Sequence, residues 1–305
     1  MSSLLSSILY RIRVKMTTIF SPIPKILHKM WQEGGIFMTL WFLGGDARSR
    51  YAAQYLSKQG YAVQTCGVPE CTDAPLAEQL SYVILPFPSF DGYHIRNSSL
   101  AAEELLQRTH EHTKLFGGLF GAWQEVFCAR GATVYDLYGS EPLTTANAVP
   151  TAEGAICLAI ENSEITLHGA SCLVVGFGRC GKVLAERLQA LHAHVTVGLR
   201  SAKDAAMAHA QGFRTDTTGL WHYELSDYDF VFNTVPTAVF SSEQLGQIRP
   251  DCLVMELSNG GILSEHQRFL HYLYAPALPG RFCPKSAGIL YAKSILGILE
   301  KEKLS

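Results

Sequence analysis

A run of apolar residues leads directly into a glycine-rich turn, and this junction most constrains the fold. Residues 171–175 read Ser-Cys-Leu-Val-Val, and residues 176–181 read Gly-Phe-Gly-Arg-Cys-Gly. A helical spacing of apolar residues follows over 183–191. A strand, a G-x-G-x-x-G turn and a helix in immediate succession are typical of the first unit of a dinucleotide-binding Rossmann domain.

Each glycine of this turn has a separate task in a dinucleotide site. Gly176 permits a tight turn, Gly178 lets the backbone approach a pyrophosphate, and Gly181 lets the helix pack closely on the strand. The free N–H groups at the start of the helix attract phosphates. The alternative interpretation is a structural turn that binds nothing. We expect a cofactor site formed by Gly176, Phe177, Gly178, Arg179, Cys180 and Gly181.

The end of the next predicted strand, 194–199, indicates which dinucleotide is bound. An NAD site usually has Asp or Glu there, which accepts hydrogen bonds from the ribose hydroxyls. This chain has Arg200 and Ser201 instead, and an arginine can hold the 2′-phosphate of NADP in two-point hydrogen bonds. The residues favour NADP over NAD as cofactor, unless Arg200 is only a solvated surface side chain.

A third strand end carries Asn233, Thr234 and Pro236. Ligands of such sheets bind at the carboxyl ends of the strands, so we expect these residues to line the nicotinamide side of the cofactor. The alternative is an ordinary turn between strand and helix, in which Pro236 ends the strand.

Short apolar runs alternate with helical patterns along most of the chain, which is typical of parallel α/β sheets. At roughly 150 residues per domain, 305 residues suggest two domains. We predict two doubly wound parallel-sheet domains, with a substrate-side domain at 38–150 and a Rossmann NAD(P)-binding domain at 151–284. The predicted strands are 39–43, 61–66, 82–86, 114–118, 133–137, 171–175, 194–199, 229–233, 252–257 and 272–275, and the predicted helices are 48–59, 98–110, 121–130, 179–191, 202–211 and 242–247.

Two further helices are expected to join and to finish these domains. Thr151 follows Pro150 and can cap a helix over 151–162, which would connect the two domains. The last helix, within 285–305, ends the chain and can fold back onto the first domain.

Residues 1–37 differ in character from the rest. They hold five Lys and Arg but one acid, within a chain whose formal charge is −2. Their order of apolar and basic residues is the reverse of a secretory signal, and a weak amphipathic membrane or transit helix is one alternative. Residues 32–35 read Gln-Glu-Gly-Gly, which a purine-rich ribosome-binding site would encode in this frame. Our hypothesis is that the native chain starts at Met38, after a mistranslated or disordered leader.

Composition excludes several classes of function. The balance of 25 basic and 27 acidic side chains argues against a nucleic-acid-binding surface. No apolar run has the roughly 18 residues of a membrane span. The eight cysteines form no C-x-x-C pair, which favours reduced thiols in a cytoplasmic protein. Two H-x-H pairs lack further ligands, so we expect no metal site.

Three segments are candidates for binding an anionic substrate. Arg48 follows a Gly-Gly-Asp sequence at the first strand end and suits two-point carboxylate binding, although the acid can instead simply cap the next helix. Asn147 and Thr151 lie at a predicted helix start, where N–H groups attract an anion. Glu153 is a candidate general base, or merely a first-turn acid favoured by the helix dipole. Ser286 can cap the last helix and face the same anion.

Taken together, six motifs resemble those of one family, the dehydrogenase-like A subunits of dipicolinate synthase. The resemblance extends over about residues 38–300. It implies oxidation of a dihydrodipicolinate-type intermediate to pyridine-2,6-dicarboxylate, with hydride transfer to NAD(P)⁺, in the cytoplasm of the mother cell of a sporulating bacterium. It also implies that the partner is a flavoprotein-like B subunit, and we further expect a homo-oligomer. The motifs are Gly44-Gly45-Asp46-x-Arg48, Asn147-x-x-Pro150-Thr151-x-Glu153-Gly154, Gly176-x-Gly178-Arg179-x-Gly181, Gly198-x-Arg200-Ser201, Asn233-Thr234-x-Pro236 and Ala275-Pro276-x-Leu278-Pro279-Gly280.

The chain departs from the family's pattern at one strand end. Where the family usually has Asp-Leu-Ala-Ser before Pro-Gly-Gly, residues 256–261 read Glu-Leu-Ser-Asn-Gly-Gly. The acid is longer and the proline is gone, so no role is assigned to Glu256.

Two other functions fit parts of the pattern. A two-domain dehydrogenase of the 2-hydroxyacid type would need a catalytic histidine with an acidic partner, but no histidine lies just before the last helix. His271 falls within a predicted strand, and His266 lies earlier. A nucleotide-binding scaffold that only activates the flavoprotein-like partner would need no catalyst of its own.

Overall fold

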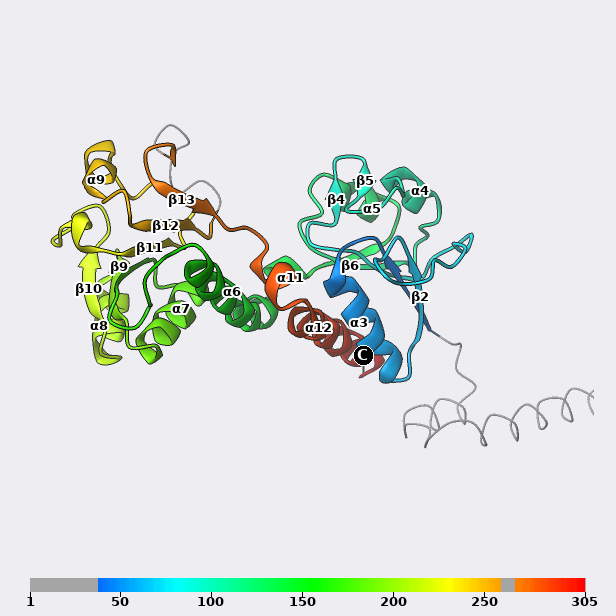
Figure 1. The fold of residues 1–305 in the computed structure, drawn as a ribbon. Coiled ribbons are helices and arrows are strands. Elements are labelled where there is room, and N and C mark those ends of the chain that lie inside the picture. Colours follow the sequence, from blue (N-terminus) through cyan, green and yellow to red (C-terminus); the bar gives the residue numbers. More distant parts are fainter. Residues whose placement is uncertain (1–37, 259–266, 305) are drawn as a thin grey trace, which may run out of the picture.

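The computed structural model describes residues 38–258 and 267–304, which form two domains, each built on a parallel sheet (Figure 1). The predicted α/β fold with two parallel-sheet domains is therefore confirmed. The proposed leader, 1–37, and residues 259–261 of the departing strand end lie outside the described residues.

The first domain has a five-stranded sheet in the order β2-β1-β3-β6-β7. Successive residues of a strand point to opposite faces, so Leu40 and Phe42 of β1 join one apolar cluster while Trp41 and Leu43 join another on the opposite face. The elements are β1 (Thr39–Leu43), α3 (Ala47–Lys58), β2 (Ala62–Cys66), β3 (Tyr82–Ile84), the hairpin β4 (Phe90–Asp91) and β5 (His94–Ile95), α4 (Ala102–Gln107), β6 (Lys114–Gly117), α5 (Trp123–Ala129), β7 (Thr133–Asp136) and the 3₁₀ turn η1 (Leu137–Gly139).

The second domain has a six-stranded parallel sheet in the order β10-β9-β8-β11-β12-β13. Numbered from its first strand, this order is 3-2-1-4-5-6, which is typical of dinucleotide-binding domains, whose ligands bind where the order reverses. That point lies between β8 and β11. The elements are β8 (Ser171–Val175), α7 (Arg179–Ala190), β9 (His194–Leu199), α8 (Ala202–Ala210), β10 (Arg214–Thr217), η2 (Leu225–Asp227), β11 (Phe230–Asn233), α9 (Ser242–Gln247), β12 (Leu253–Glu256) and β13 (His271–Tyr274).

Three helices connect the domains: α6 (Glu141–Glu161), α11 (Leu278–Phe282) and α12 (Pro284–Leu304). The last of them packs against α3 (Figure 1). Its residues Ala292, Ile295 and Leu299 are buried in the core of the first domain. The hydroxyl of Tyr291 donates to the carbonyl oxygen of Leu85 at 2.7 Å. The chain therefore leaves the first domain through α6 and returns to it through α12.

The expected helix start at Thr151 is wrong. A single helix, α6, begins ten residues earlier at Glu141 and continues through Pro150. The hydroxyl of Thr151 donates to the carbonyl oxygen of Asn147 at 2.8 Å within this helix. Pro142 occupies the first turn, where a missing N–H costs nothing, and Pro150 lacks only one interior hydrogen bond.

Several short elements are not expected from the sequence, among them the hairpin β4–β5, strand β10 and helix α11. The polar strand β10, Arg-Thr-Asp-Thr, lies at the edge of the second sheet. Helix α11 lies within the proline-rich segment expected to be a loop, after Ala277 at φ +54°. Among the described residues, no helix is both long and apolar enough to cross a membrane.

Candidate active site

The glycine turn connects β8 to α7, and two of its glycines have no room for a side chain. Gly176 has φ +99°, and a Cβ there would lie 2.5 Å from the hydroxyl oxygen of Thr234. A Cβ on Gly181 would overlap the carbonyl oxygen of Gly176, so only glycine allows α7 to approach the turn this closely. Gly178, in contrast, is exposed, and a Cβ there would meet nothing within 4 Å.

Open space at Gly178 suits a phosphate-binding turn. Gly178 is the N-cap residue of α7, a helix of 12 residues, and no side chain caps it. The unused N–H groups and the dipole at this helix end attract anions. This geometry fits the pyrophosphate of a dinucleotide, which the backbone of Gly176, Gly178 and Gly181 would hold.

Sheet pairing brings the other predicted cofactor residues to the same edge. Val175 is paired with Gly198 of β9 on one side and with Asn233 of β11 on the other. The N–H of Gly176 donates to the carbonyl oxygen of Gly198 at 2.7 Å. Arg200 and Thr234 therefore follow strands that flank the glycine turn.

Two turn residues contribute backbone rather than side chains. Phe177 is 5% exposed and packs edge-on against Phe213 in the apolar core. The thiol of Cys180 is half-buried and hydrogen-bonded to Thr151, and burial raises its pKa. The expectation that these two residues bind the cofactor can hold only for their main-chain atoms.

Arg179 is the exposed cation of the turn, and it contacts the start of α6. Its Nη1 donates to the carboxylate of Glu141 at 2.7 Å and to the hydroxyl of Thr144 at 2.6 Å. The ion pair is solvent-exposed and therefore weak, so a phosphate could compete for this guanidinium.

Arg200 and Ser201 follow β9, and no acidic residue lies between this strand and α8. Arg200 is exposed and forms no ion pair within the described part of the chain, while Ser201 caps α8 by accepting from the N–H of Asp204 at 3.3 Å. The neighbouring strand β10 holds Asp216, whose side chain is 1% exposed and accepts from the N–H and the ring of His222. This acid is therefore not available to a ribose hydroxyl.

Asn233 lies at the predicted edge, but its side chain does not face a ligand. It is fully buried, and its amide donates to both oxygens of Glu256, at 3.0 and 2.9 Å. Thr234 is half-buried, and its hydroxyl donates to the carbonyl oxygen of Val175 at 2.8 Å, while Pro236 is exposed. Glu256 has no role predicted from the sequence, and only its pairing with Asn233 shows that it belongs to this edge.

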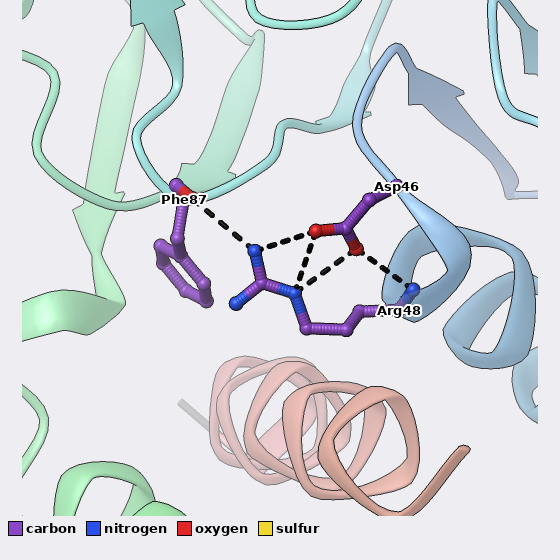
Figure 2. Close-up of polar contacts among 3 residues, drawn as sticks. All are labelled: Asp46, Arg48 and Phe87. Atoms are coloured by element: carbon purple, nitrogen blue, oxygen red, sulfur yellow. Dashed lines mark hydrogen bonds and ion pairs between the residues drawn. The ribbon is translucent and has the colours of Figure 1, made fainter. Parts of the chain in front are cut away.

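In the first domain, Arg48 lies at the start of α3 and is held by Asp46 (Figure 2). The carboxylate of Asp46 also caps α3 by accepting from the N–H of Arg48 at 2.8 Å. The guanidinium reaches the carbonyl oxygen of Phe87 at 3.4 Å, while its Nη1 makes no hydrogen bond to a described residue. A Cβ on Gly280 of α11 would lie 3.0 Å from its Nε, so α11 passes directly over this pair. Both interpretations of the Gly-Gly-Asp segment therefore apply, because the acid caps the helix and orients the arginine.

Among the described residues, no hydrogen bond or ion pair joins the other predicted substrate residues to Arg48. Asn147 and Thr151 lie inside α6, so the argument that a helix N-terminus binds an anion there is wrong. Glu153 is exposed on α6, and its carboxylate lies 3.6 Å from Nε of Arg187, in the last turn of α7 and thus at the far end from the glycine turn. Ser286 is exposed in the first turn of α12 and does not cap it, because the helix begins at Pro284.

Comparison with known proteins covers both domains. Residues 39–138 match the family of N-terminal domains from the A subunits of dipicolinate synthase. Residues 151–270 match the NAD-binding domain of the D-isomer-specific 2-hydroxyacid dehydrogenases. The chain is therefore similar to the dipicolinate synthase A subunits. The NAD-binding match supports an oxidoreductase with a nicotinamide dinucleotide as cofactor.

Individual dipicolinate synthase A subunits are similar to this chain over most of its length. The dipicolinate synthase A subunit of Bacillus subtilis (strain 168) is 28% identical over 279 residues, which cover 84% of this chain and 94% of that protein. The crystal structure of the same protein from Bacillus subtilis superposes with a TM-score of 0.77 at 26% identity, covering 88% of this chain and 98% of the other. The crystal structure of the Bacillus halodurans counterpart gives a TM-score of 0.78 at 25% identity, covering 87% and 99%.

Proposed function

We propose that this protein is the dehydrogenase subunit of a dipicolinate synthase, which oxidises a dihydrodipicolinate-type intermediate to pyridine-2,6-dicarboxylate. The proposal rests on one observation, which is that the same chain contains two complementary sites. An open glycine turn suited to a dinucleotide follows β8, and an oriented arginine suited to a carboxylate follows β1. The similarity to the Bacillus subtilis dipicolinate synthase supplies the substrate class.

The reaction removes a hydride from a ring carbon and a proton from its neighbour. The nicotinamide of NAD(P)⁺ accepts the hydride when bound. Because aromatisation makes the step strongly favourable, the protein mainly has to position the ring. Arg48 would hold one substrate carboxylate through the part of its guanidinium that Asp46 does not use. The position of Glu153 beside Arg187 does not support it as the general base.

We further propose NADP as the preferred nucleotide. Arg200 is exposed at the end of β9 without an ion-pair partner among the described residues, and Asp216 is occupied by His222. Arg200 and Ser201 would then hold the 2′-phosphate. The test is the dissociation constant of NADPH and of NADH for Arg200→Ala. A selective loss of NADPH affinity, roughly tenfold or more, is expected, and equal effects on both nucleotides would refute the assignment.

The proposed reaction can be tested directly. The purified protein is mixed with freshly formed product of dihydrodipicolinate synthase and NADP⁺ or NAD⁺, with and without the flavoprotein-like partner. NADPH and dipicolinate are followed by absorbance. Formation of both in equal amounts is expected, and no turnover with either nucleotide would favour a non-catalytic nucleotide-binding scaffold.

We also propose that the partner is a flavoprotein-like B subunit, that the chain self-associates into a homo-oligomer, and that it works in the cytoplasm of the mother cell. The name of the Bacillus subtilis relative designates one subunit of a synthase, which supports a companion subunit. Co-purification of the two proteins and light scattering of this chain without its partner test these two associations.

One other activity has specific support. Residues 151–270 match the NAD-binding domain of 2-hydroxyacid dehydrogenases, so oxidation of a 2-hydroxyacid is the second candidate. The segment between β13 and α12 contains no histidine to act as its base. Turnover of D-lactate or glycerate by the purified protein would favour this candidate.

A further inference from the structure

A buried polar cluster lies beside the glycine turn, and the proposed function does not use it. It consists of Asn233, Glu256 and Ser258, at the carboxyl ends of β11 and β12. Parallel pairing sets Val175, Asn233 and Glu256 in one line across three neighbouring strands. Asn233 is 0% exposed and Glu256 is 1% exposed.

Hydrogen-bond donors take the place of a counter-charge at Glu256. Both of its oxygens accept from the amide of Asn233, at 3.0 and 2.9 Å. Oε1 also accepts from the N–H of Ser258 at 3.0 Å and contacts its hydroxyl. No Lys, Arg or His of the described chain bonds to this carboxylate. A buried carboxylate is tolerated only when its oxygens accept hydrogen bonds. Here the amide of Asn233 donates to both oxygens.

The same asparagine fixes the turn after β11. Its Nδ2 donates to the carbonyl oxygen of Val235 at 3.1 Å, and its Oδ1 accepts from the N–H of Val235 at 3.2 Å. The hydroxyl of Ser258 donates to the same carbonyl oxygen at 2.7 Å. The turn is therefore held from both sides by the cluster.

Thr234 connects the turn after β11 to the glycine turn after β8. Its N–H and hydroxyl both donate to the carbonyl oxygen of Val175, at 3.0 and 2.8 Å. A Cβ on Gly176 would lie 2.5 Å from its hydroxyl oxygen and 2.8 Å from a methyl group of Val235. A continuous series of hydrogen bonds and close contacts therefore links Glu256 to the backbone that would bind the pyrophosphate.

We propose that Glu256 is a positioning residue for the dinucleotide, which acts through Asn233 to hold the turn 233–235 against Gly176. This inference rests on the proposed function for the identity of the ligand. It requires a carboxylate at 256, because Nδ2 of Asn233 donates to both oxygens and an amide at 256 would set N–H against N–H.

Exchanging the amide and the carboxylate between positions 233 and 256 tests whether these two side chains act as a pair. The variants are Glu256→Gln, Asn233→Asp, the double variant Asn233→Asp/Glu256→Gln, and Glu300→Gln on the exposed face of α12 as control. Asp at 233 keeps an acceptor for the N–H of Val235 but loses the donor to its carbonyl oxygen, so Gln at 256 restores only the contact between the two side chains. The dissociation constant of NADPH is measured by fluorescence, with circular dichroism and melting temperature to verify the fold.

Each single variant is expected to weaken NADPH binding roughly tenfold, and the double variant to bind NADPH about threefold more tightly than either single variant, while Glu300→Gln has no effect. Single variants that bind like the wild type, or a double variant no better than the singles, would overturn the proposal. Should the single variants fail to fold, Ser258→Ala removes only one hydroxyl and is expected to weaken binding about threefold; unchanged binding by that variant would count against the proposal.

Hydrogen exchange of the protein without nucleotide separates this inference from the proposed function. The amides of residues 234 and 235 are expected to exchange faster in Glu256→Gln than in the wild type and to slow again in part in the double variant. Wild-type protein that binds neither NADPH nor NADH would refute the proposed function, and the positioning proposal falls with it. Normal binding by the wild type with unchanged exchange in Glu256→Gln refutes the positioning role alone.

Discussion

The guanidinium of Arg48 and the carboxylate of Asp46 form a two-point ion pair at the carboxyl end of β1 (Figure 2). Nε lies 3.0 Å from both carboxylate oxygens, and Nη2 lies 2.8 Å from Oδ2. Burial by itself would raise the pKa of Asp46, but the hydrogen bonds and charge of Arg48 outweigh it and lower that pKa. The carboxylate of Asp46 is therefore ionised at neutral pH, and it fixes the direction in which the arginine can receive a further anion.

Replacing Arg48 should affect the substrate and not the nucleotide. Loss of a hydrogen bond to a charged group costs about 1.5–3 kcal/mol, so Arg48→Ala should raise KM for the dicarboxylate by roughly tenfold to a hundredfold. Arg48→Lys keeps the charge but cannot bond Asp46 at two points, and should fall in between. Steady-state kinetics with each substrate varied in turn provide the measurement, and equal effects on both values of KM would remove the anchor role.

Two glycines of the same turn should respond differently to alanine. Gly178→Ala places its methyl group in open space, so we expect an unchanged melting temperature and weaker NADPH binding. Gly181→Ala forces a methyl group against the carbonyl oxygen of Gly176, and overpacking of this kind costs about 1–3 kcal/mol. Melting curves and NADPH titrations of both variants distinguish the effects. Full NADPH affinity in Gly178→Ala would show that the phosphates bind elsewhere.

Asp216 should make stability depend on pH in the acid range. Burial alone would raise its pKa, but hydrogen bonds from His222, Tyr223 and Thr217 lower it below the ordinary value of 3.8. Since the unfolded chain binds the proton more tightly, the stabilisation is complete above the ordinary pKa and is lost as pH falls through the folded value. Asp216→Asn should destabilise the protein by about 1–3 kcal/mol at pH 7.

Urea unfolding at several pH values tests this dependence. The difference in unfolding free energy between the wild type and Asp216→Asn should shrink below about pH 4. A difference that stays constant down to about pH 3 would mean that the charge of Asp216 contributes nothing to stability.

Helix α12 should be required for the stability of the first domain, although it follows the second domain in the chain. Leu299 is 1% exposed in the core of the first domain, and its replacement by Ala should cost about 2–5 kcal/mol. Glu300→Ala on the exposed face is the matched control, with an expected change within about 0.5 kcal/mol. Chemical unfolding followed by tryptophan fluorescence gives both values. Equal stabilities of the two variants would show that α12 is only loosely attached.

Features that depend only on residues close together in the sequence could be predicted from it. The glycine turn was predicted with its strand and helix because its chemistry is local: a positive φ at Gly176 and a close approach at Gly181 both follow from spacing. Buried strands such as β8 and β11 were predicted because a strand covered on both faces is a continuous apolar run. The edge strand β10 was missed because its polar sequence carries no such signal.

The candidate site was predicted only in part, because side-chain partners lie far apart in the sequence. The direction of Asn233 depends on Glu256, which is brought opposite it by strand pairing. The helix through Thr151 begins at Glu141 because it packs against both domains, with Leu143 in the core of the first and Ala152 in the core of the second, and this packing overrides the local signal of Pro150.

The sequence by itself determined the two α/β units, the glycine turn and the residue types at each strand end, since these follow from hydrophobic period and turn chemistry. Only the tertiary structure decided which of those residues face a ligand. It oriented Arg48 on Asp46, buried Asn233 against Glu256, and separated Glu153 from the glycine turn. The physical reason is that a buried polar group takes whichever partner the fold brings within hydrogen-bond distance, and strand order, not sequence spacing, sets that distance.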